Sequence, residues 1–237
     1  MLSVPQNSTE GADIAAGLAA VRARIAIAVG AAGRSEDSVT LLAVSKGHGA
    51  PRIRAAADLG LRDFGENYVA EALPKIQALA GRGLTWHFIG RVQANKTALL
   101  ARHFDWVHGV DRATVAARLS TQRGTDAPPL NICLQVNVLG EVSKAGVSPA
   151  DLPALLDATR DLPSLSLRGL MCMLPYGADE AEQARGFGGL QALFHAARRR
   201  GFALDTLSMG MSADLESAIA HGATLLRVGT ALFGARE

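Results

Sequence analysis

Eight short apolar runs, each followed by a polar turn, recur along this 237-residue chain, and segments with helical spacing lie between them. Strands that alternate with helices favour a parallel sheet, and eight such units predict an α/β fold that closes into a (β/α)8 barrel. An open doubly wound sheet is the main alternative, but no GxGxxG follows the first run and the chain has no GxxxxGK[ST] loop. The apolar runs are residues 40–45, 61–65, 85–90, 105–110, 130–138, 167–173, 206–209 and 225–229.

Helical spacing is found between these runs and also before the first of them. A helix over residues 12–29, opened by Ser8 or Thr9 and ended by Gly30, precedes the barrel. Few residues follow the last run, so we expect this extra N-terminal helix to cover the gap left by a missing final helix. No Pro/Ser-rich linker divides the chain, which predicts a single domain over residues 1–237. The other expected helices are 51–59, 67–79, 113–122, 149–160, 181–200 and 213–220.

Charge and composition exclude several classes of protein. Lys and Arg number 24 and Asp and Glu 22, and a net charge of +2 does not suggest a partner such as nucleic acid or an anionic membrane. The longest stretch without a charged residue, 127–140, has 14 residues and is too short to span a bilayer. Residues 1–10 do not resemble a secretion signal, so a cytoplasmic protein is expected. The two cysteines are expected to be buried thiols, and neither they nor the histidines have metal-ligand spacing, so no metal site is predicted.

In a barrel of this kind, functional residues gather at the carboxyl ends of the strands. Lys46 ends the first run and, by strand alternation, continues the face of Leu42 and Val44. A lysine on an apolar face at the barrel mouth is partly desolvated, which lowers its pKa and prepares its amine to attack an aldehyde or ketone. The alternative is a solvated lysine that simply begins the loop, as most lysines at strand ends do.

The ends of the last two runs have the features of an anion site. Ser212 is a good N-cap for the helix that begins near Ala213, and Gly229 with Thr230 offers close backbone approach and a hydroxyl. Phosphate sites in (β/α)8 barrels lie between these two loops. An ordinary cap and an ordinary turn are the alternative, because acidic residues in the first turn of the helix would repel a phosphate unless they face away.

Arg227 shares a strand face with Leu225 and Gly229 and so points into the mouth if Lys46 does. A buried guanidinium needs an acceptor, which is either an internal carboxylate or the nitrogen of a pyridine ring. A lysine for an aldehyde, a phosphate cradle and an arginine for a ring nitrogen together describe a site for pyridoxal 5′-phosphate.

Several specific motifs run through residues 41–236. They are AVSK at 43–46, FGENYVAE at 64–71, WHFIG at 86–90 followed by QANK, VNVLGEVSKAG at 136–146, RGLM at 168–171, SMGMSADLESAI and RVGTALFGAR. By these motifs the chain resembles the pyridoxal phosphate homeostasis proteins, relatives of the N-terminal barrel of alanine racemase. The resemblance implies a barrel of the third fold type of pyridoxal-phosphate proteins.

The resemblance also implies roles for individual residues. Lys46 is similar to the lysine that holds the cofactor as an aldimine, and Arg227 to the partner of the pyridine nitrogen. The phosphate cradle corresponds to Ser212, Gly229 and Thr230. Three further residues are expected around the ring of the cofactor: Asn67, Met211 and His87.

The chain departs from the family pattern at the rim of the barrel. Arg91 and Val92 stand where the family usually has Pro-Leu, and Ala94 where it has serine. Leu139 replaces a common serine or threonine, and Gly47 follows the lysine where threonine or asparagine is common. These changes concern partner contacts or cofactor exchange more than cofactor binding.

The sequence favours a carrier over a catalyst. Racemisation needs an acid/base on each face of the cofactor, and the chain has only two tyrosines, Tyr68 and Tyr176. An arginine beside the ring nitrogen also weakens the ring as an electron sink. The resemblance implies a role without clear catalytic activity in vitamin B6 and amino-acid homeostasis, with no catalytic residue assigned.

Two enzymatic alternatives stay open: a pyridoxal-phosphate-dependent racemase or lyase, and a class I aldolase-like barrel whose lysine attacks a sugar phosphate. Apo-forms of B6-dependent enzymes are the expected partners, and a monomer is the expected state. Lys144 is either a transient landing site for the aldehyde or a solvated loop residue.

Overall fold

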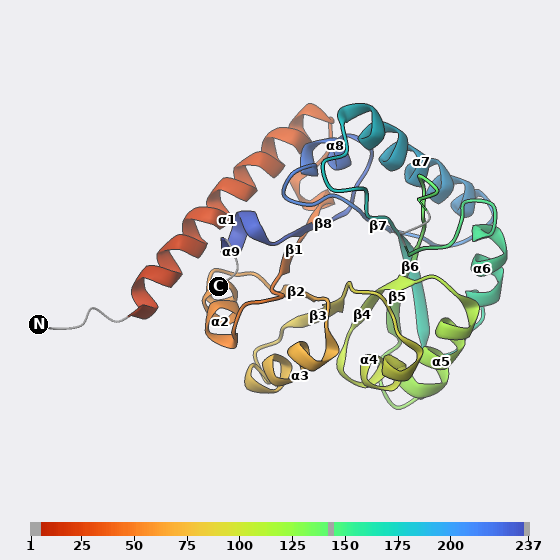
Figure 1. Ribbon diagram of the computed structural model, residues 1–237, viewed down its shortest axis with the longest axis horizontal. Coiled ribbons are helices and arrows are strands. Elements are labelled where there is room, and N and C mark those ends of the chain that lie inside the picture. The colour runs from red at the N-terminus through yellow and green to blue at the C-terminus, as the bar shows by residue number, and fades with distance from the viewer. Residues whose placement is uncertain (1–5, 142–144, 235–237) are drawn as a thin grey trace, which may run out of the picture.

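The computed structural model describes residues 6–141 and 145–234. Within them, eight parallel strands form a closed barrel in the order β1-β2-β3-β4-β5-β6-β7-β8, which confirms the predicted fold (Figure 1). The strands are β1 (Thr40–Val44), β2 (Asp63–Glu66), β3 (Thr85–Phe88), β4 (Trp106–Val110), β5 (Leu130–Gln135), β6 (Leu165–Met171), β7 (Thr206–Ser208) and β8 (Leu225–Val228).

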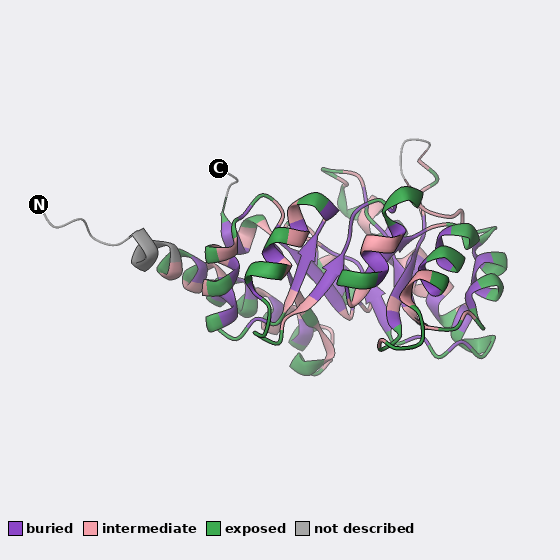
Figure 2. Cartoon of the chain, turned by 90° about the horizontal axis from the view of Figure 1, so that it is seen from below, coloured by how far each residue is buried: buried purple, intermediate pink, exposed green. Residues whose placement is uncertain are grey.

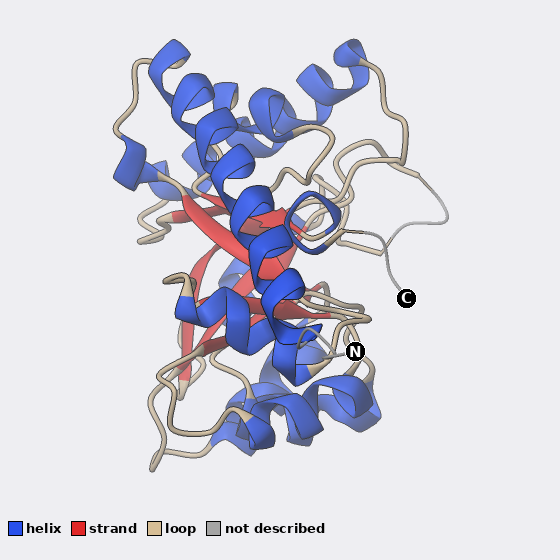
Figure 3. Ribbon diagram, turned by 90° about the vertical axis from the view of Figure 1, so that its left-hand side faces the viewer, coloured by secondary structure: helices blue, strands red, loops and turns tan. Residues whose placement is uncertain are grey.

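Helices surround this barrel, as Figure 3 shows, and one of them separates each pair of consecutive strands. Two short 3-10 segments, Glu36–Ser38 and Ala94–Lys96, precede β1 and α4. The helices are α1 (Gln6–Ala31), α2 (Ala50–Asp58), α3 (Val69–Ala78), α4 (Thr97–His103), α5 (Ala113–Arg123), α6 (Leu152–Thr159), α7 (Glu180–Arg199), α8 (Leu215–Ala220) and α9 (Thr230–Phe233).

The N-terminal helix closes the outer ring, as the sequence predicts. α1 packs against α8, α9 and α2, and it lies where a full helix after β8 would stand in a complete ring (Figure 1). The contact with the four-residue α9 is so close that a Cβ atom on Gly17 would fall 2.8 Å from the carbonyl oxygen of Leu232. Gly17 therefore allows α1 to seat directly on the end of the chain.

The apolar side chains form two layers, one between the strands and the helices and one inside the barrel. Figure 2 shows that the strands are buried, whereas the helices have exposed residues on their outer faces. Most buried side chains belong to the layer between strands and helices. A small separate cluster of Leu42, Val44, Ile89 and Leu225 lies inside the barrel. Because Leu42, Val44 and Leu225 belong to this inner cluster, alternation along β1 and β8 directs Lys46 and Arg227 inward as well.

The ends of several elements differ from the predicted ones. β5 stops at Gln135 rather than at residue 138, and α6 starts at Leu152 rather than at 149. The loop between them, at the carboxyl end of β5, is therefore longer than predicted. α3 starts at Val69, so Asn67 and Tyr68 lie in the loop before the helix. Both cysteines, Cys133 and Cys172, are buried free thiols as predicted, and burial raises the pKa of each.

By length and composition alone, the Gly11–Ala31 part of α1 is apolar enough to cross a membrane. This segment is not one of the uncharged stretches of the sequence, because it contains Asp13, Arg22 and Arg24. In the structure its apolar stripe faces the barrel, and the five side chains of that stripe are at most 8% exposed. They are Ile14, Leu18, Val21, Ile25 and Val29.

This packing predicts unequal effects for two substitutions on the same helix. Leu18→Ala removes a side chain that is 3% exposed, and we expect it to lower the free energy of unfolding by about 2–5 kcal/mol. Ile27→Ala removes one that is 75% exposed, and we expect a change within about 0.5 kcal/mol. Urea unfolding of both variants measures the difference. Equal losses would show that α1 does not pack on the barrel through this stripe.

Candidate functional site

The carboxyl ends of β1 and β8 meet at one small pocket. Lys46, two residues beyond the end of β1, lines it together with Gly229 and Thr230, which follow β8. A Cβ atom on Gly229 would lie 3.2 Å from the carbonyl oxygen of Val44, so the glycine is what lets the two strand ends approach. The structure thus brings together three of the residues that the sequence predicts around the cofactor.

The loop after β7 joins this pocket through Ser212. The Ser212 Oγ accepts a hydrogen bond of 3.4 Å from the backbone N–H of Ala231, the residue after Thr230. Gly210 has a φ of +91°, and a side chain there would collide with Ala218, so glycine is required where the chain turns into this loop. Ser212 and Thr230 therefore lie on adjacent loops, in the place where barrels of this fold bind phosphate.

The two acidic residues that begin α8 have separate partners. Glu216 pairs with Arg24 of α1, with contacts of 2.7 and 2.8 Å, and so faces the outside of the barrel. Asp214 accepts a hydrogen bond of 2.5 Å from the backbone N–H of Met211 and stays within its own loop. Acids in the first turn of α8 would repel a phosphate unless they face away from it. Glu216 faces away, whereas Asp214 stays in the loop that holds Met211.

Arg227 is buried, with 4% of its surface exposed. Its Nη1 donates to Ser208 Oγ and its Nη2 to the carbonyl oxygen of Cys172, each at 2.8 Å. Burial lowers the pKa of this guanidinium, although the group stays protonated at neutral pH because arginine titrates far above it. Within the described residues no carboxylate forms an ion pair with Arg227, so the internal carboxylate partner that the sequence left open is not found there.

Asn67 follows β2 and Met211 lies in the loop after β7, so both stand at carboxyl ends of strands. The Oδ1 atom of Asn67 is buried and has no hydrogen-bond partner in the described structure. Its backbone packs directly against Gly90, at the end of β3, where any side chain would collide with the Asn67 carbonyl. Met211 follows Gly210, whose carbonyl oxygen accepts a hydrogen bond of 3.0 Å from the backbone N–H of Arg227. An orphaned acceptor on Asn67 fits a site that takes a ligand with a hydrogen-bond donor.

A network of charged residues that was not predicted from the sequence contacts the residues on either side of Lys46. The buried Nζ of Lys75 contacts Glu66 Oε1 at 2.8 Å and Glu71 Oε1 at 2.6 Å. Glu66 in turn accepts from the hydroxyl of Ser45 at 2.6 Å, and Glu71 accepts from the backbone N–H of Gly47 at 2.5 Å. The residues on both sides of Lys46 are therefore held by the end of β2 and by α3. The i, i+4 spacing of Glu71 and Lys75 was the available signal, since such pairs stabilise one face of a helix.

The pKa values of the two carboxyl groups in this network move in opposite directions. Burial raises the pKa of Glu66 more than the hydrogen bonds from Lys75 and Ser45 lower it. Burial also acts to raise the pKa of Glu71, but hydrogen bonds from Lys75 and Gly47 outweigh it and the pKa is lowered. Lys75 thus opposes the effect of burial on Glu66 and helps to hold the pKa of Glu71 down.

The structure does not bring His87 to this mouth. His87 is 1% exposed, its Nε2 lies 3.0 Å from Asp63 Oδ1, and both residues line a cavity at the opposite, amino-terminal ends of the strands. His87 was expected near the cofactor. It lies within β3, and its ring turns toward Asp63 at the start of β2, away from the mouth that holds Lys46. Lys144, the other lysine considered from the sequence, lies outside the described residues.

Comparison with known proteins gives a consistent result. Residues 17–237 match the family described as alanine racemase, N-terminal domain. The pyridoxal phosphate homeostasis protein of Pseudomonas aeruginosa is 55% identical over 224 residues, which cover 94% of this chain and 96% of that protein. The structure of PipY from Synechococcus elongatus with PLP bound is similar, with a TM-score of 0.82 and 39% identity over 93% of this chain and 100% of that one. An alanine racemase from Corynebacterium glutamicum shares the fold, with a TM-score of 0.67 and 18% identity, over 92% of this chain and 61% of the racemase.

The network behind Lys46 predicts a pH-dependent loss of stability. Lys75→Met leaves Glu66 buried without its cation, and we expect the free energy of unfolding to fall by about 3–5 kcal/mol near pH 7. The pKa of Glu66 is then raised further in the folded state, so the loss shrinks as the pH falls toward the unfolded value of about 4.3, where the group is protonated in both states.

Urea unfolding at about pH 7 and about pH 5 measures this effect. Lys96→Met, at an exposed lysine, is the matched control and is expected to change stability by less than about 0.5 kcal/mol at either pH. A Lys75→Met loss that does not shrink at the lower pH would contradict the assignment of a buried charge to Glu66.

Proposed function

The chain belongs to the family of pyridoxal phosphate homeostasis proteins, which carry the alanine racemase N-terminal domain, and on this premise we propose that it binds pyridoxal 5′-phosphate at the carboxyl-terminal mouth of its barrel. The protein holds the cofactor there and acts in vitamin B6 and amino-acid homeostasis. It performs this role as a carrier rather than as a catalyst.

One observation supports this proposal above the others. Arg227 is buried, forms no ion pair within the described residues, and lies on β8, whose carboxyl end lines the pocket of Lys46. Among the described residues the hydrogen-bond partners of Arg227 are neutral oxygen atoms, and two residues later, just beyond β8, the chain reaches Gly229 in that pocket. A buried cation of this kind favours a ligand that offers it an acceptor. A pyridine nitrogen is such an acceptor, and the phosphate of the same ligand suits the adjacent loops.

Each residue of the site has a proposed part in holding the cofactor. Ser212, Gly229 and Thr230 bind the phosphate through their backbone N–H groups and hydroxyls. Arg227 donates to the ring nitrogen, and Asn67 and Met211 flank the ring. His87 has no direct contact in this proposal and belongs to the opposite mouth.

Lys46 is proposed to hold the cofactor covalently. When bound, pyridoxal phosphate would supply an aldehyde with which the Lys46 amine could condense, the aldehyde oxygen leaving as water. The network of Glu66, Glu71 and Lys75 serves this step by fixing the residues before and after Lys46. These carboxylates contact Lys75, Ser45 and Gly47, so they set the position of the loop.

The placement of the two tyrosines supports a carrier. Tyr176 is fully exposed and Tyr68 is 66% exposed, so neither tyrosine is held against the mouth within the described structure. Arg227 stays protonated, so it donates to the ring nitrogen instead of protonating it and leaves the ring a weak electron sink. Racemisation needs an acid/base on each face of the cofactor, and the two exposed tyrosines do not offer the second one at the mouth.

Partners and location follow from this role. Apo-forms of B6-dependent enzymes are the proposed recipients of the cofactor, and the cytoplasm is the proposed site of exchange. A monomer is proposed because the barrel closes on itself and α1 completes its outer ring.

The proposal predicts a coloured protein whose cofactor is attached to Lys46. After incubation with pyridoxal phosphate and gel filtration, we expect a visible absorption band, and borohydride reduction followed by peptide mapping is expected to place the adduct on Lys46. Lys46→Ala is expected to lose the band, whereas the exposed control Lys96→Ala keeps it. A protein that stays colourless with added cofactor would contradict the proposal and favour the aldolase-like alternative.

The carrier role predicts no proton exchange at the α-carbon of amino acids. When the loaded protein is incubated with alanine and other amino acids in deuterated water, we expect their α-proton NMR signals to persist over hours. Loss of an α-proton signal at a rate that depends on protein concentration would instead establish a racemase or lyase.

A further inference from the structure

A line of five polar side chains crosses the interior of the barrel from one mouth to the other. Arg227 Nη1 lies 2.8 Å from Ser208 Oγ, which lies 2.8 Å from His108 Nδ1. His108 Nε2 lies 3.0 Å from His87 Nδ1, and His87 Nε2 lies 3.0 Å from Asp63 Oδ1. We refer to this hydrogen-bonded line as the interior relay; its members are Arg227 of β8, Ser208 of β7, His108 of β4, His87 of β3 and Asp63 of β2.

Burial favours the neutral form of both imidazoles of the relay. His87 is 1% exposed and His108 is fully buried. Burial lowers the pKa of His87 more than its hydrogen bond to Asp63 raises it. Burial first, and then the electrostatic influence of the neighbouring His87 and Arg227 side chains, lowers the pKa of His108 well below its usual value. The relay therefore has its formal charges only at its ends, a guanidinium and a carboxylate.

Neutral imidazoles allow a single consistent direction of donation. Ser208 Oγ accepts from Arg227, so its hydroxyl is available to donate to His108 Nδ1. His108 then carries its proton on Nε2 and donates to His87 Nδ1. His87 also carries its proton on Nε2 and donates to Asp63. The opposite direction would set an unprotonated Nε2 of His87 against the Asp63 carboxylate, which is two acceptors face to face.

The far end of the relay opens on a cavity of about 370 Å³ at the amino-terminal ends of the strands, lined by Asp63, His87, Trp106 and Asp205 among others. The His87 ring is stacked on Trp106, with 5.3 Å between ring centroids and an interplanar angle of 11°. This packing fixes the plane of the imidazole. The side chain of Asp63 is 29% exposed, so the carboxylate end of the relay is in contact with the cavity.

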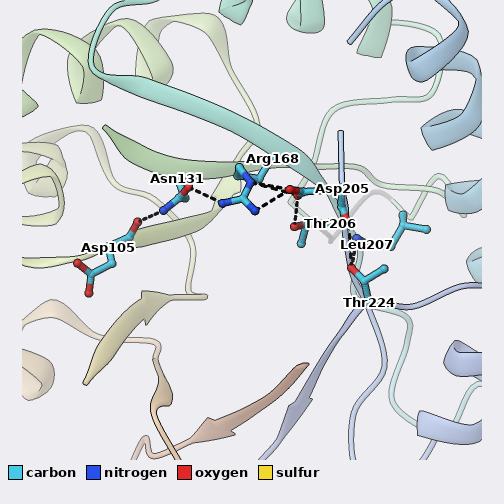
Figure 4. Close-up of polar contacts among 7 residues, drawn as sticks. All are labelled: Asp105, Asn131, Arg168, Asp205, Thr206, Leu207 and Thr224. Atoms are coloured by element: carbon cyan, nitrogen blue, oxygen red, sulfur yellow. Dashed lines mark hydrogen bonds and ion pairs between the residues drawn. The ribbon is translucent and has the colours of Figure 1, made fainter. Parts of the chain in front are cut away.

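The other acid of this cavity is already neutralised. Figure 4 shows Arg168 between Asn131 and Asp205, and its guanidinium contacts both oxygens of the Asp205 carboxylate at 2.6–3.1 Å. Arg168 also donates to Asn131 Oδ1 at 2.9 Å. Asp63, in contrast, has no arginine or lysine partner within the described residues. The negative charge of Asp63 is thus balanced along the relay and not across the cavity.

We propose that Asp63, His87, His108 and Ser208 are positioning residues for the cofactor site, which orient the Arg227 guanidinium from the opposite mouth of the barrel. The Asp63 carboxylate sets the direction of every hydrogen bond in the relay, so that Ser208 always presents an acceptor to Arg227. The charge of Asp63 at one mouth thereby determines how firmly Arg227 is held at the other. This inference rests on the proposed binding of pyridoxal phosphate for its effect on the cofactor, but not for the state of the histidines.

Histidine tautomers in the protein without cofactor test the direction of the relay. Long-range 1H–15N NMR distinguishes the two neutral tautomers and the imidazolium, and His87→Gln and His108→Gln provide the assignments. We expect both His87 and His108 to be neutral and protonated on Nε2 at neutral pH. A proton on Nδ1 of either ring, or a charged ring, would overturn the relay whether or not the protein binds a cofactor.

A matched pair of variants at the same cavity tests the effect on Arg227. Asp63→Asn keeps the size of the side chain and removes the charge that orders the relay, so we expect pyridoxal phosphate to dissociate about tenfold more readily, with a shifted absorption maximum. Asp205→Asn removes a carboxylate of the same cavity outside the relay and is expected to leave the affinity and the spectrum unchanged.

The outcomes separate the two proposals. Wild-type protein that binds the cofactor, with Asp63→Asn binding equally well and with the same spectrum, overturns the relay and leaves the proposed function intact. Equal weakening by Asp205→Asn also overturns it, because the effect would then belong to the cavity as a whole. Failure of the wild type to bind contradicts the proposed function, while the tautomers still decide the relay. If Asp63→Asn fails to fold, the wild-type tautomers alone decide it.

Discussion

Closure of the barrel between its first and last strands is the constraint on which the candidate site depends. β1 and β8 pair in parallel with Leu42 opposite Arg227 and Ala43 opposite Val228. This register carries Lys46 and Gly229 to the same mouth, although they stand 183 positions apart in the sequence. A shift of one residue would turn either Lys46 or Arg227 to the outside, because side chains alternate along a strand. The glycine at 229 and the serine at 212 then complete a site whose parts come from opposite ends of the chain.

The interior of this barrel is divided between apolar and polar side chains. Leu42, Val44, Ile89 and Leu225 fill one part, and Gly65 leaves them room, because a Cβ atom there would fall 3.2 Å from Leu42. The interior relay occupies another part and connects the two mouths. Apolar side chains could fill the same space. Burying polar side chains instead requires that each of them finds its hydrogen-bond partners. Their hydrogen bonds specify one arrangement of Arg227, which an apolar filling could not do.

Much of the fold and part of the site could be predicted from the sequence. The alternation of apolar runs and helical segments gave eight strands in the right places, because strand and helix periods differ enough to be read locally. Inward-facing residues followed from strand alternation alone, as Lys46 and Arg227 show. Ser212 and Thr230 could be paired because the fold places the last two loops side by side.

The remaining features depend on contacts that no local pattern encodes. Whether His87 approaches one mouth or the other is decided by the ring orientation inside β3, and its partners Asp63 and His108 lie 24 and 21 residues away. No sequence pattern marked Lys75 as buried, because its burial follows from the packing of α3 against β2. Ser208 was predicted only as a member of the seventh apolar run, although it links Arg227 to the histidines.

The most direct measurement of the central claim is a crystal structure of the protein grown with pyridoxal phosphate. The account predicts continuous density from Lys46 Nζ to the cofactor, with the phosphate between Ser212 and Gly229–Thr230 and the ring nitrogen within hydrogen-bond distance of Arg227. Density for the cofactor at the amino-terminal mouth, or at Lys46 with its ring nitrogen turned away from Arg227, would contradict it.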